Sequence, residues 1–95
     1  MEKLDPIHPG EILLEEFLNP MKLRQNHLAK QLHISEKIIN EIADGKRSIS
    51  ADTALRLSHY FGNSAKFWLG LQMDYDLEIT KDEIENSLDI EPYTS

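Results

Sequence analysis

The stretch QNHLAKQLHISEKIINEIAD, residues 25–44, predicts two short amphipathic helices that meet at a sharp turn. Six apolar residues recur at helical spacing in this stretch: Leu28, Ala29, Leu32, Ile38, Ile39 and Ile42. Only His33, Ile34 and Ser35 lie between the apolar residues of the first helix and those of the second. Three residues are too few for anything except a tight turn. The small side chain of Ala29 lets two crossing helices approach each other closely. Together these features predict a helix-turn-helix, an arrangement that places its second helix in the major groove of DNA.

The residues at the ends of the two predicted helices favour the same interpretation. Ser35 is a good N-cap for the second helix, and Ile34 before it is placed to pack on Ile39 as a hydrophobic staple. Gly45 is a typical residue for the end of that helix. His33 falls at the corner, where we expect a positive φ and where glycine is more comfortable.

Three further helices are predicted outside this stretch, within residues 9–18, 50–61 and 64–75. The first begins with a proline in its first turn and ends at Asn19-Pro20, and the second ends at Gly62. No segment alternates apolar and polar residues as a half-buried strand does. The sequence therefore predicts an all-α chain with five helices.

Length and composition predict one small domain. With 95 residues, 40% of them hydrophobic, the chain can bury one modest core. We expect that core within residues 1–79, followed over residues 80–95 by an acidic tail in which residues 82–88 are a candidate short helix. The chain has no cysteine, which fits the reducing cytoplasm. Because no signal peptide and no membrane-spanning run is evident, we expect a cytoplasmic protein with no membrane partner.

The net charge of −7 is concentrated at the C-terminal end. Residues 1–73 hold nine basic and nine acidic side chains, whereas residues 74–95 hold one basic and eight acidic ones. Residues 22–47, around the predicted helix-turn-helix, hold six basic side chains and three acidic ones. DNA phosphates respond to the nearby field, which salt screens over about 10 Å, so the low overall charge does not exclude DNA. The distribution indicates a nucleic-acid-binding body with an acidic appendage.

The exposed flank of the second helix supplies the candidate base-reading residues. With its isoleucines facing the core, this helix offers five residues to the groove: Ser35, Glu36, Lys37, Asn40 and Glu41. Lys37 is suited to donate to guanine, Asn40 to pair with adenine, and a glutamate to accept from cytosine. The plain alternative is that these residues only keep a surface helix soluble. For the two glutamates three roles stay open: reading cytosine, raising specificity at a cost in affinity, and lying beside the groove.

Phosphate contacts are predicted at both ends of the helix-turn-helix. Gln25 opens the first helix, and Lys46 and Arg47 follow the second. Contacts of this kind position a protein on DNA without reading its sequence. A Lys-Arg pair in a polar loop is ordinarily solvated surface, so it is the preceding motif that favours phosphate binding here.

Phe67, Trp68 and Leu71 are candidates for a dimer interface, because a small core leaves apolar surface uncovered. Packing in the core is the alternative, which the composition favours, for Trp68 together with Phe67 and Tyr75. The four histidines have no metal-ligand spacing and no cysteine beside them, so we predict neither a metal nor a cofactor. The sequence also lacks a nucleophile with a base at useful spacing and a glycine-rich phosphate loop, which disfavours an enzyme.

Four short motifs carry a family resemblance: HPGEIL at residues 8–13, GKRSIS at 45–50, FWLGLQ at 67–72 and YDL at 75–77. In this order they resemble the HigA/VapI-type antitoxins, members of the Xre helix-turn-helix group with a repressor-like fold, over residues 7–78. The resemblance implies a homodimer that represses its own operon at a palindromic, double-stranded DNA operator. It also implies a partner protein, a small RelE-like ribonuclease toxin of the HigB type.

The resemblance leaves several points open. His33 stands where helix-turn-helix proteins usually have glycine, and the paired acids Glu36 and Glu41 leave the operator sequence undetermined. Two surfaces are candidates for the toxin: the acidic tail, which suits a basic RNA-binding groove, and the polar side of the first helix. The plain alternative for the tail is a solvated segment that only keeps the protein soluble. The alternatives to an antitoxin are a solitary Xre-type transcriptional regulator and a protein-binding adaptor with weak DNA affinity.

Overall fold

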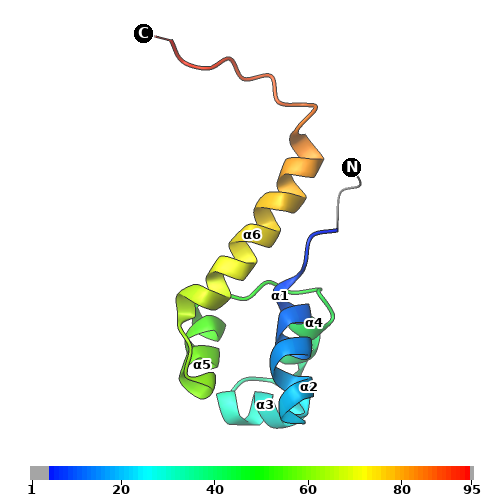
Figure 1. Cartoon of the computed structure of the whole chain (residues 1–95), viewed down its shortest axis with the longest axis vertical. Coiled ribbons are helices and arrows are strands. Elements are labelled where there is room, and N and C mark those ends of the chain that lie inside the picture. The colour runs from blue at the N-terminus through cyan, green and yellow to red at the C-terminus, as the bar shows by residue number, and fades with distance from the viewer. Residues whose placement is uncertain (1–4, 95) are drawn as a thin grey trace.

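The computed structural model describes residues 5–94 as five helices, the last of which extends well beyond the others (Figure 1). In chain order the elements are α1 (Pro9–Ile12), the π-helix η1 (Leu13–Leu18), α2 (Asn19–Met21), α3 (Gln25–Leu32), α4 (Glu36–Ala43), α5 (Ala51–Phe61) and α6 (Ala65–Ile84). The first three elements follow one another without a break and together form the first helix. Residues 5–94 contain no strand, so the all-α prediction is confirmed.

Serine side chains begin three of the helices, as the sequence predicts. The hydroxyls of Ser35, Ser50 and Ser64 each accept a hydrogen bond from the backbone N–H three residues on, at 3.3, 3.2 and 3.0 Å. A cap of this kind stabilises a helix by about 1 kcal/mol. Gly62 ends α5 with a φ of 77°, a left-handed conformation that glycine adopts without strain. These local signals fix where α4, α5 and α6 begin.

The prediction that Asn19-Pro20 ends the first helix is wrong, because the helix continues through Met21. Proline has no N–H to donate and usually breaks a helix. Here it follows the π-helical turns of Leu13–Leu18, in which the Asn19 N–H reaches back five residues to the Leu14 carbonyl. The wider turn changes the hydrogen-bond pattern ahead of the proline, and Lys22, with a φ of 54°, ends the helix instead.

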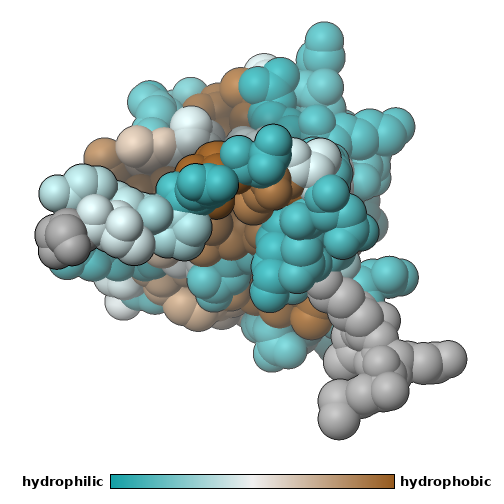
Figure 2. All heavy atoms as spheres, turned by 90° about the horizontal axis from the view of Figure 1, so that it is seen from above, coloured by the Kyte–Doolittle hydropathy of each residue, from teal (hydrophilic) through white to brown (hydrophobic). Residues whose placement is uncertain are grey.

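Helix α6 is longer than predicted. It runs without a break from Ala65 to Ile84, so the segment that was the candidate for a separate short helix, residues 82–88, contributes only its first three residues, as the last turn of α6. No glycine or proline occurs in residues 71–91, so nothing in the chain interrupts it. Its C-terminal half and the residues after it project from the body (Figure 1). Seen along this projecting end, apolar surface lies near the centre of the molecule and hydrophilic residues flank it (Figure 2).

The core lies where the first helix, α3, α4, α5 and the N-terminal half of α6 meet. Its buried apolar residues are Leu13, Leu18, Leu28, Ala29, Leu32, Ile39, Ile42, Ile49, Ala54, Leu57 and Trp68. Trp68 has 0% of its surface exposed, its ring lies 4.9 Å from that of Phe17, and its Nε1 donates to Asn63 Oδ1 at 2.9 Å. Of the two alternatives for Trp68, the structure therefore favours the core. Across residues 5–94, each helix is too short or too polar to cross a lipid bilayer.

Candidate nucleic-acid interface

Helix α4 is held by its isoleucine side and leaves its other flank open. Ile39 and Ile42 are completely buried, as the helix-turn-helix pattern predicts. Ser35, Glu36 and Lys37, at the N-terminal end of the helix, are exposed. In a helix-turn-helix this end of the second helix is the part that reaches base edges. The structure therefore leaves the N-terminal part of the predicted base-reading flank uncovered, whereas Asn40 and Glu41 farther along are half-buried.

Three of the predicted contact residues line one surface hollow. Gln25 from the start of α3 and Glu36 and Asn40 from α4 surround a space of about 460 Å³. Asn40 is half-buried there, so part of its side chain packs against the body while the rest faces the hollow. The arrangement brings a candidate phosphate contact and two candidate base contacts together. Their roles on DNA stay predictions.

Lys46 and Arg47 lie at the opposite, C-terminal end of α4. Gly45, with a φ of 75°, turns the chain out of the helix, and the Lys46 N–H bonds back to the Glu41 carbonyl at 2.8 Å. Arg47 then folds back along α4, where its Nε and Nη2 donate to Glu41 Oε1 at 3.1 and 2.8 Å. The hydrogen bond from Arg47, helped by the charges of Lys37 and Lys46, lowers the pKa of Glu41. Glu41 is therefore an ionised, paired residue.

Helix α1 lies directly on the C-terminal end of α4. A Cβ added to Gly10 would lie 1.8 Å from the carbonyl oxygen of Ile42, so only glycine permits this approach. The side chain of His8 caps α1, since its Nδ1 accepts from the Gly10 N–H at 2.9 Å. His8 and Gly10 thus help to set the position of α4, the helix that enters the DNA groove in a helix-turn-helix and is called the recognition helix below.

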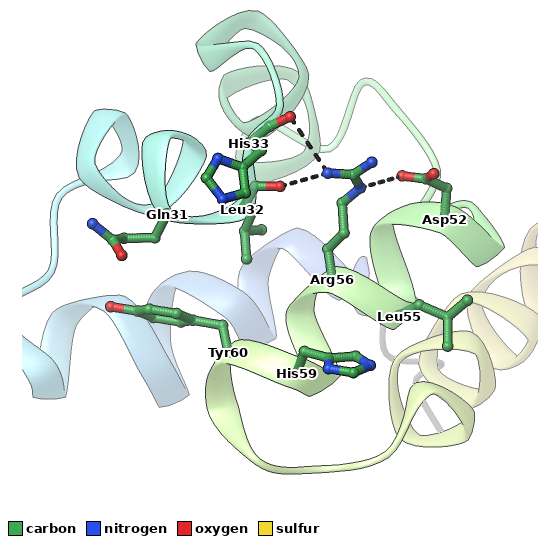
Figure 3. Close-up of a pocket in the computed structure, with 8 residues that line it drawn as sticks. All are labelled: Gln31, Leu32, His33, Asp52, Leu55, Arg56, His59 and Tyr60. Carbon is green, nitrogen blue, oxygen red and sulfur yellow. Dashed lines mark hydrogen bonds and ion pairs between the residues drawn. The ribbon is translucent and has the colours of Figure 1, made fainter.

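Arg56 of α5 braces the corner between α3 and α4 (Figure 3). Its Nη1 donates to the carbonyl oxygens of Leu32 and His33, at 2.7 and 3.4 Å, and its Nε donates to Asp52 at 2.7 Å. His33 has a φ of 58°, so the predicted left-handed corner is confirmed. Arg56 therefore satisfies carbonyls that the end of a helix leaves without partners.

Comparison with known proteins identifies this arrangement. A helix-turn-helix family model matches residues 14–68. Virulence-associated protein I of Dichelobacter nodosus is 52% identical over 81 residues, which are 85% of this chain and 75% of that protein. The antitoxin HigA of Pseudomonas aeruginosa, solved with the higBA promoter, superposes with a TM-score of 0.89 at 42% identity and covers 94% of this chain and 99% of its own. A HigA-family addiction module antidote protein from Coxiella burnetii is 46% identical, with a TM-score of 0.81 over 95% of this chain and 100% of its own.

The chain is a HigA/VapI-type antitoxin of the Xre helix-turn-helix family. The motifs that resemble this family meet around the loop after the recognition helix. Gln72, from FWLGLQ, is buried and accepts the Ile49 N–H at 2.8 Å, which ties α6 to the GKRSIS loop. Tyr75, from YDL, packs edge-on against His8 of HPGEIL, with ring centroids 4.9 Å apart. In this HigA/VapI-type antitoxin the motifs outside the helix-turn-helix therefore hold its recognition helix in place.

Two arginines near the interface were missed in the sequence analysis. Arg24 lines the hollow between α3 and α4 and occupies the N-cap position of α3, where it makes no capping hydrogen bond. A cation where serine, threonine or aspartate is usual is a signal for a phosphate contact. Arg56 gave no such signal, because its carbonyl partners lie 24 and 23 residues away in the chain.

The cap at His8 predicts a loss of stability in mild acid. Burial lowers the pKa of His8 below its ordinary value of 6.5, and the backbone of Arg47 and the charge of Asp76 only partly offset this. Between the lowered pKa and 6.5 the unfolded chain binds more protons than the folded chain, so stability rises with pH. We expect the melting temperature to fall as the pH is lowered through this window. The variant His8→Ser keeps a capping side chain but has no imidazole, so its melting temperature should fall less over the same pH window. An equal fall in the variant would mean that other groups cause the loss of stability.

Proposed function

We propose that the chain is the antitoxin of a type II toxin-antitoxin pair, which represses its own operon as a homodimer and neutralises a HigB-type ribonuclease. It acts by binding, without catalysis, in the cytoplasm. The observation that carries the DNA-binding half is the open flank of α4, with Gln25, Glu36 and Asn40 around one hollow. The similar HigA of Pseudomonas aeruginosa was solved with promoter DNA, which supports DNA binding by this chain.

Two-fold symmetry gives the operator its expected form. A dimer presents two recognition helices to successive major grooves on one face of DNA when they are about 34 Å apart. Phe67, 40% exposed on α6, and the half-buried Leu71 remain the candidates for the dimer contact. Trp68 has no exposed surface to contribute and supports them from the core.

Within each half-site, Lys37 and Asn40 are the proposed base readers, with Ser35 and Glu36 beside them at the same end of α4. Gln25, Lys46 and Arg47 are the proposed phosphate contacts, with Arg24 beside Gln25 as a fourth. The test compares two duplexes of equal length and composition: the promoter DNA directly upstream of the chain's operon, called the promoter duplex, and a scrambled duplex. Purified chain should prefer the promoter duplex, and its affinity should fall steeply with salt. Equal, weak binding to both would reject the repressor function.

The end of α6 and the acidic tail are the proposed toxin-binding surface. Residues 80–95 hold five acidic and one basic side chain, and among them Ile84, Leu88 and Ile90 are 39%, 56% and 78% exposed. A ribonuclease needs a basic surface to bind RNA, and acidic residues around apolar anchors complement such a surface. The acidic end is also unsuited to DNA, since phosphates repel it.

We therefore expect a chain lacking residues 80–95 to inhibit the HigB-type toxin of the same operon at least about tenfold less well. Its affinity for the promoter duplex should stay within about twofold of the full chain, because the truncation keeps the part of α6 that packs on the core. Toxin titrations in a ribonuclease assay measure the first quantity and fluorescence anisotropy the second. Full neutralisation by the truncated chain would move the toxin site to the first helix.

A further inference from the structure

The carboxylate of Glu41 lies among the cations of the DNA-binding surface. Arg47 donates to its Oε1 from both Nε and Nη2, at 3.1 and 2.8 Å. Lys37, one helical turn earlier, and Lys46 in the following loop also attract it. The side chains of Glu41 and Arg47 are 31% and 44% exposed, so the pair is reachable by DNA and does not belong to the core. An exposed pair of this kind contributes little to stability, which leaves its effect on binding as its main consequence.

The pair changes what both residues can do on DNA. Oε1 of Glu41 already accepts two hydrogen bonds from its own chain, so only Oε2 is left to accept one from a cytosine. Arg47 still has N–H groups for a phosphate oxygen, but its side chain is fixed along α4 and its charge is balanced by Glu41. Arg47 therefore makes a good phosphate contact only with DNA whose backbone passes close to the guanidinium in its paired position beside Glu41.

We infer that Glu41 is a specificity-determining residue that acts through Arg47. A free arginine is long and flexible, and it neutralises a phosphate on DNA of any sequence. Glu41 prevents this by holding the guanidinium in one place and cancelling its field elsewhere. Operator DNA, docked by the base contacts of α4, brings a phosphate to the held guanidinium, whereas other DNA does not. Glu41 thus lowers the affinity for non-operator DNA more than the affinity for the operator. This inference rests on the proposed operator binding.

The test is the Glu41→Gln variant, measured by fluorescence anisotropy on the promoter and scrambled duplexes. Without Glu41 a phosphate on any DNA no longer competes with a carboxylate for the guanidinium, and for an exposed pair that competition is worth up to about fivefold in affinity. We expect a gain of about fivefold on the scrambled duplex and a gain below about twofold on the promoter duplex. The preference for the promoter duplex then falls, and the salt dependence on scrambled DNA becomes steeper.

Two controls separate the role of Arg47 from a general effect of charge. Asp74→Asn removes the same charge from an exposed position on α6 and should leave the preference unchanged. In an Arg47→Gln background, Glu41→Gln should change the affinity for both duplexes by the same factor. An unchanged preference in Glu41→Gln, or the same loss of preference with Arg47 absent, overturns the inference. If the wild-type chain shows no preference at all, the operator proposal itself fails, and the two failures are thereby distinguished.

Discussion

Replacing Gly10 with alanine is expected to lower the free energy of unfolding by about 3 kcal/mol. The added Cβ would lie 1.8 Å from the carbonyl oxygen of Ile42 and 2.7 Å from its carbonyl carbon. Both atoms belong to the backbone at the end of the recognition helix, so no side-chain rotation relieves the overlap. Helix α1 must move away from α4, and the buried contacts between them loosen. Overpacking of a rigid interface usually costs 1–3 kcal/mol, and a backbone obstacle places this site at the upper end.

Gly70 provides the matched control, because nothing lies within 4 Å of a Cβ added there. Gly70 lies inside α6, so Gly70→Ala should raise the free energy of unfolding by about 0.5–1 kcal/mol. Urea denaturation followed by circular dichroism, at one protein concentration, measures both variants. Equal effects of the two substitutions would mean that α1 does not press on α4. In folded Gly10→Ala the affinity for the promoter duplex should also fall, since α4 is displaced.

The features that the sequence predicts well are those set by neighbours in the chain. An N-cap depends on one side chain and the N–H three residues on, so Ser35, Ser50 and Ser64 are recognisable without a structure. The same holds for the left-handed corner at His33, where two helices too close for a loop force the backbone to turn. The periodic isoleucines of α4 likewise predict which flank is buried.

The features that the sequence does not predict depend on residues distant in the chain. Nothing around Gly10 reveals that the end of α4 lies on it, and nothing around Arg56 reveals the carbonyls it satisfies. The course of α6 is a different case. Its apolar pattern weakens because the helix leaves the core, whereas helix formation continues since no glycine or proline ends it. In this part of α6 the spacing of apolar residues therefore does not predict how far the helix extends.

The candidate DNA-binding site shows the same division. The helix-turn-helix pattern alone places Ser35, Glu36 and Lys37 on an exposed flank. Whether an exposed charge is available to DNA depends on its partner, and the loop that returns Arg47 to Glu41 is visible only in three dimensions. That pair also weakens the adaptor interpretation, because Arg47 balances the charge of Glu41, one of the two acids on α4 that would otherwise repel DNA.

Asn40→Ala is expected to weaken binding to the promoter duplex by roughly 10- to 100-fold, or about 1–3 kcal/mol. Asn40 stands half-buried beside Gln25 and Glu36 on the hollow between α3 and α4, so packing limits the freedom of its side chain. An asparagine restricted in this way suits adenine, which offers one donor and one acceptor in the major groove. The alanine side chain has neither the donor nor the acceptor, so both hydrogen bonds to adenine are lost. Binding to the scrambled duplex, which depends on phosphate contacts, should change less than about twofold.

The position that Asn40 reads can be found by changing the promoter duplex one base pair at a time. Each change at a contacted base weakens the wild-type chain by about 1–3 kcal/mol. At the base pair read by Asn40, the change should cost Asn40→Ala nothing further, because the contact is already lost. Lys46→Ala serves as the comparison, since a phosphate contact contributes to both duplexes and its loss should weaken them alike. If Asn40→Ala also weakens both duplexes equally, Asn40 only positions the chain, and the reading of adenine must be assigned to another residue of α4.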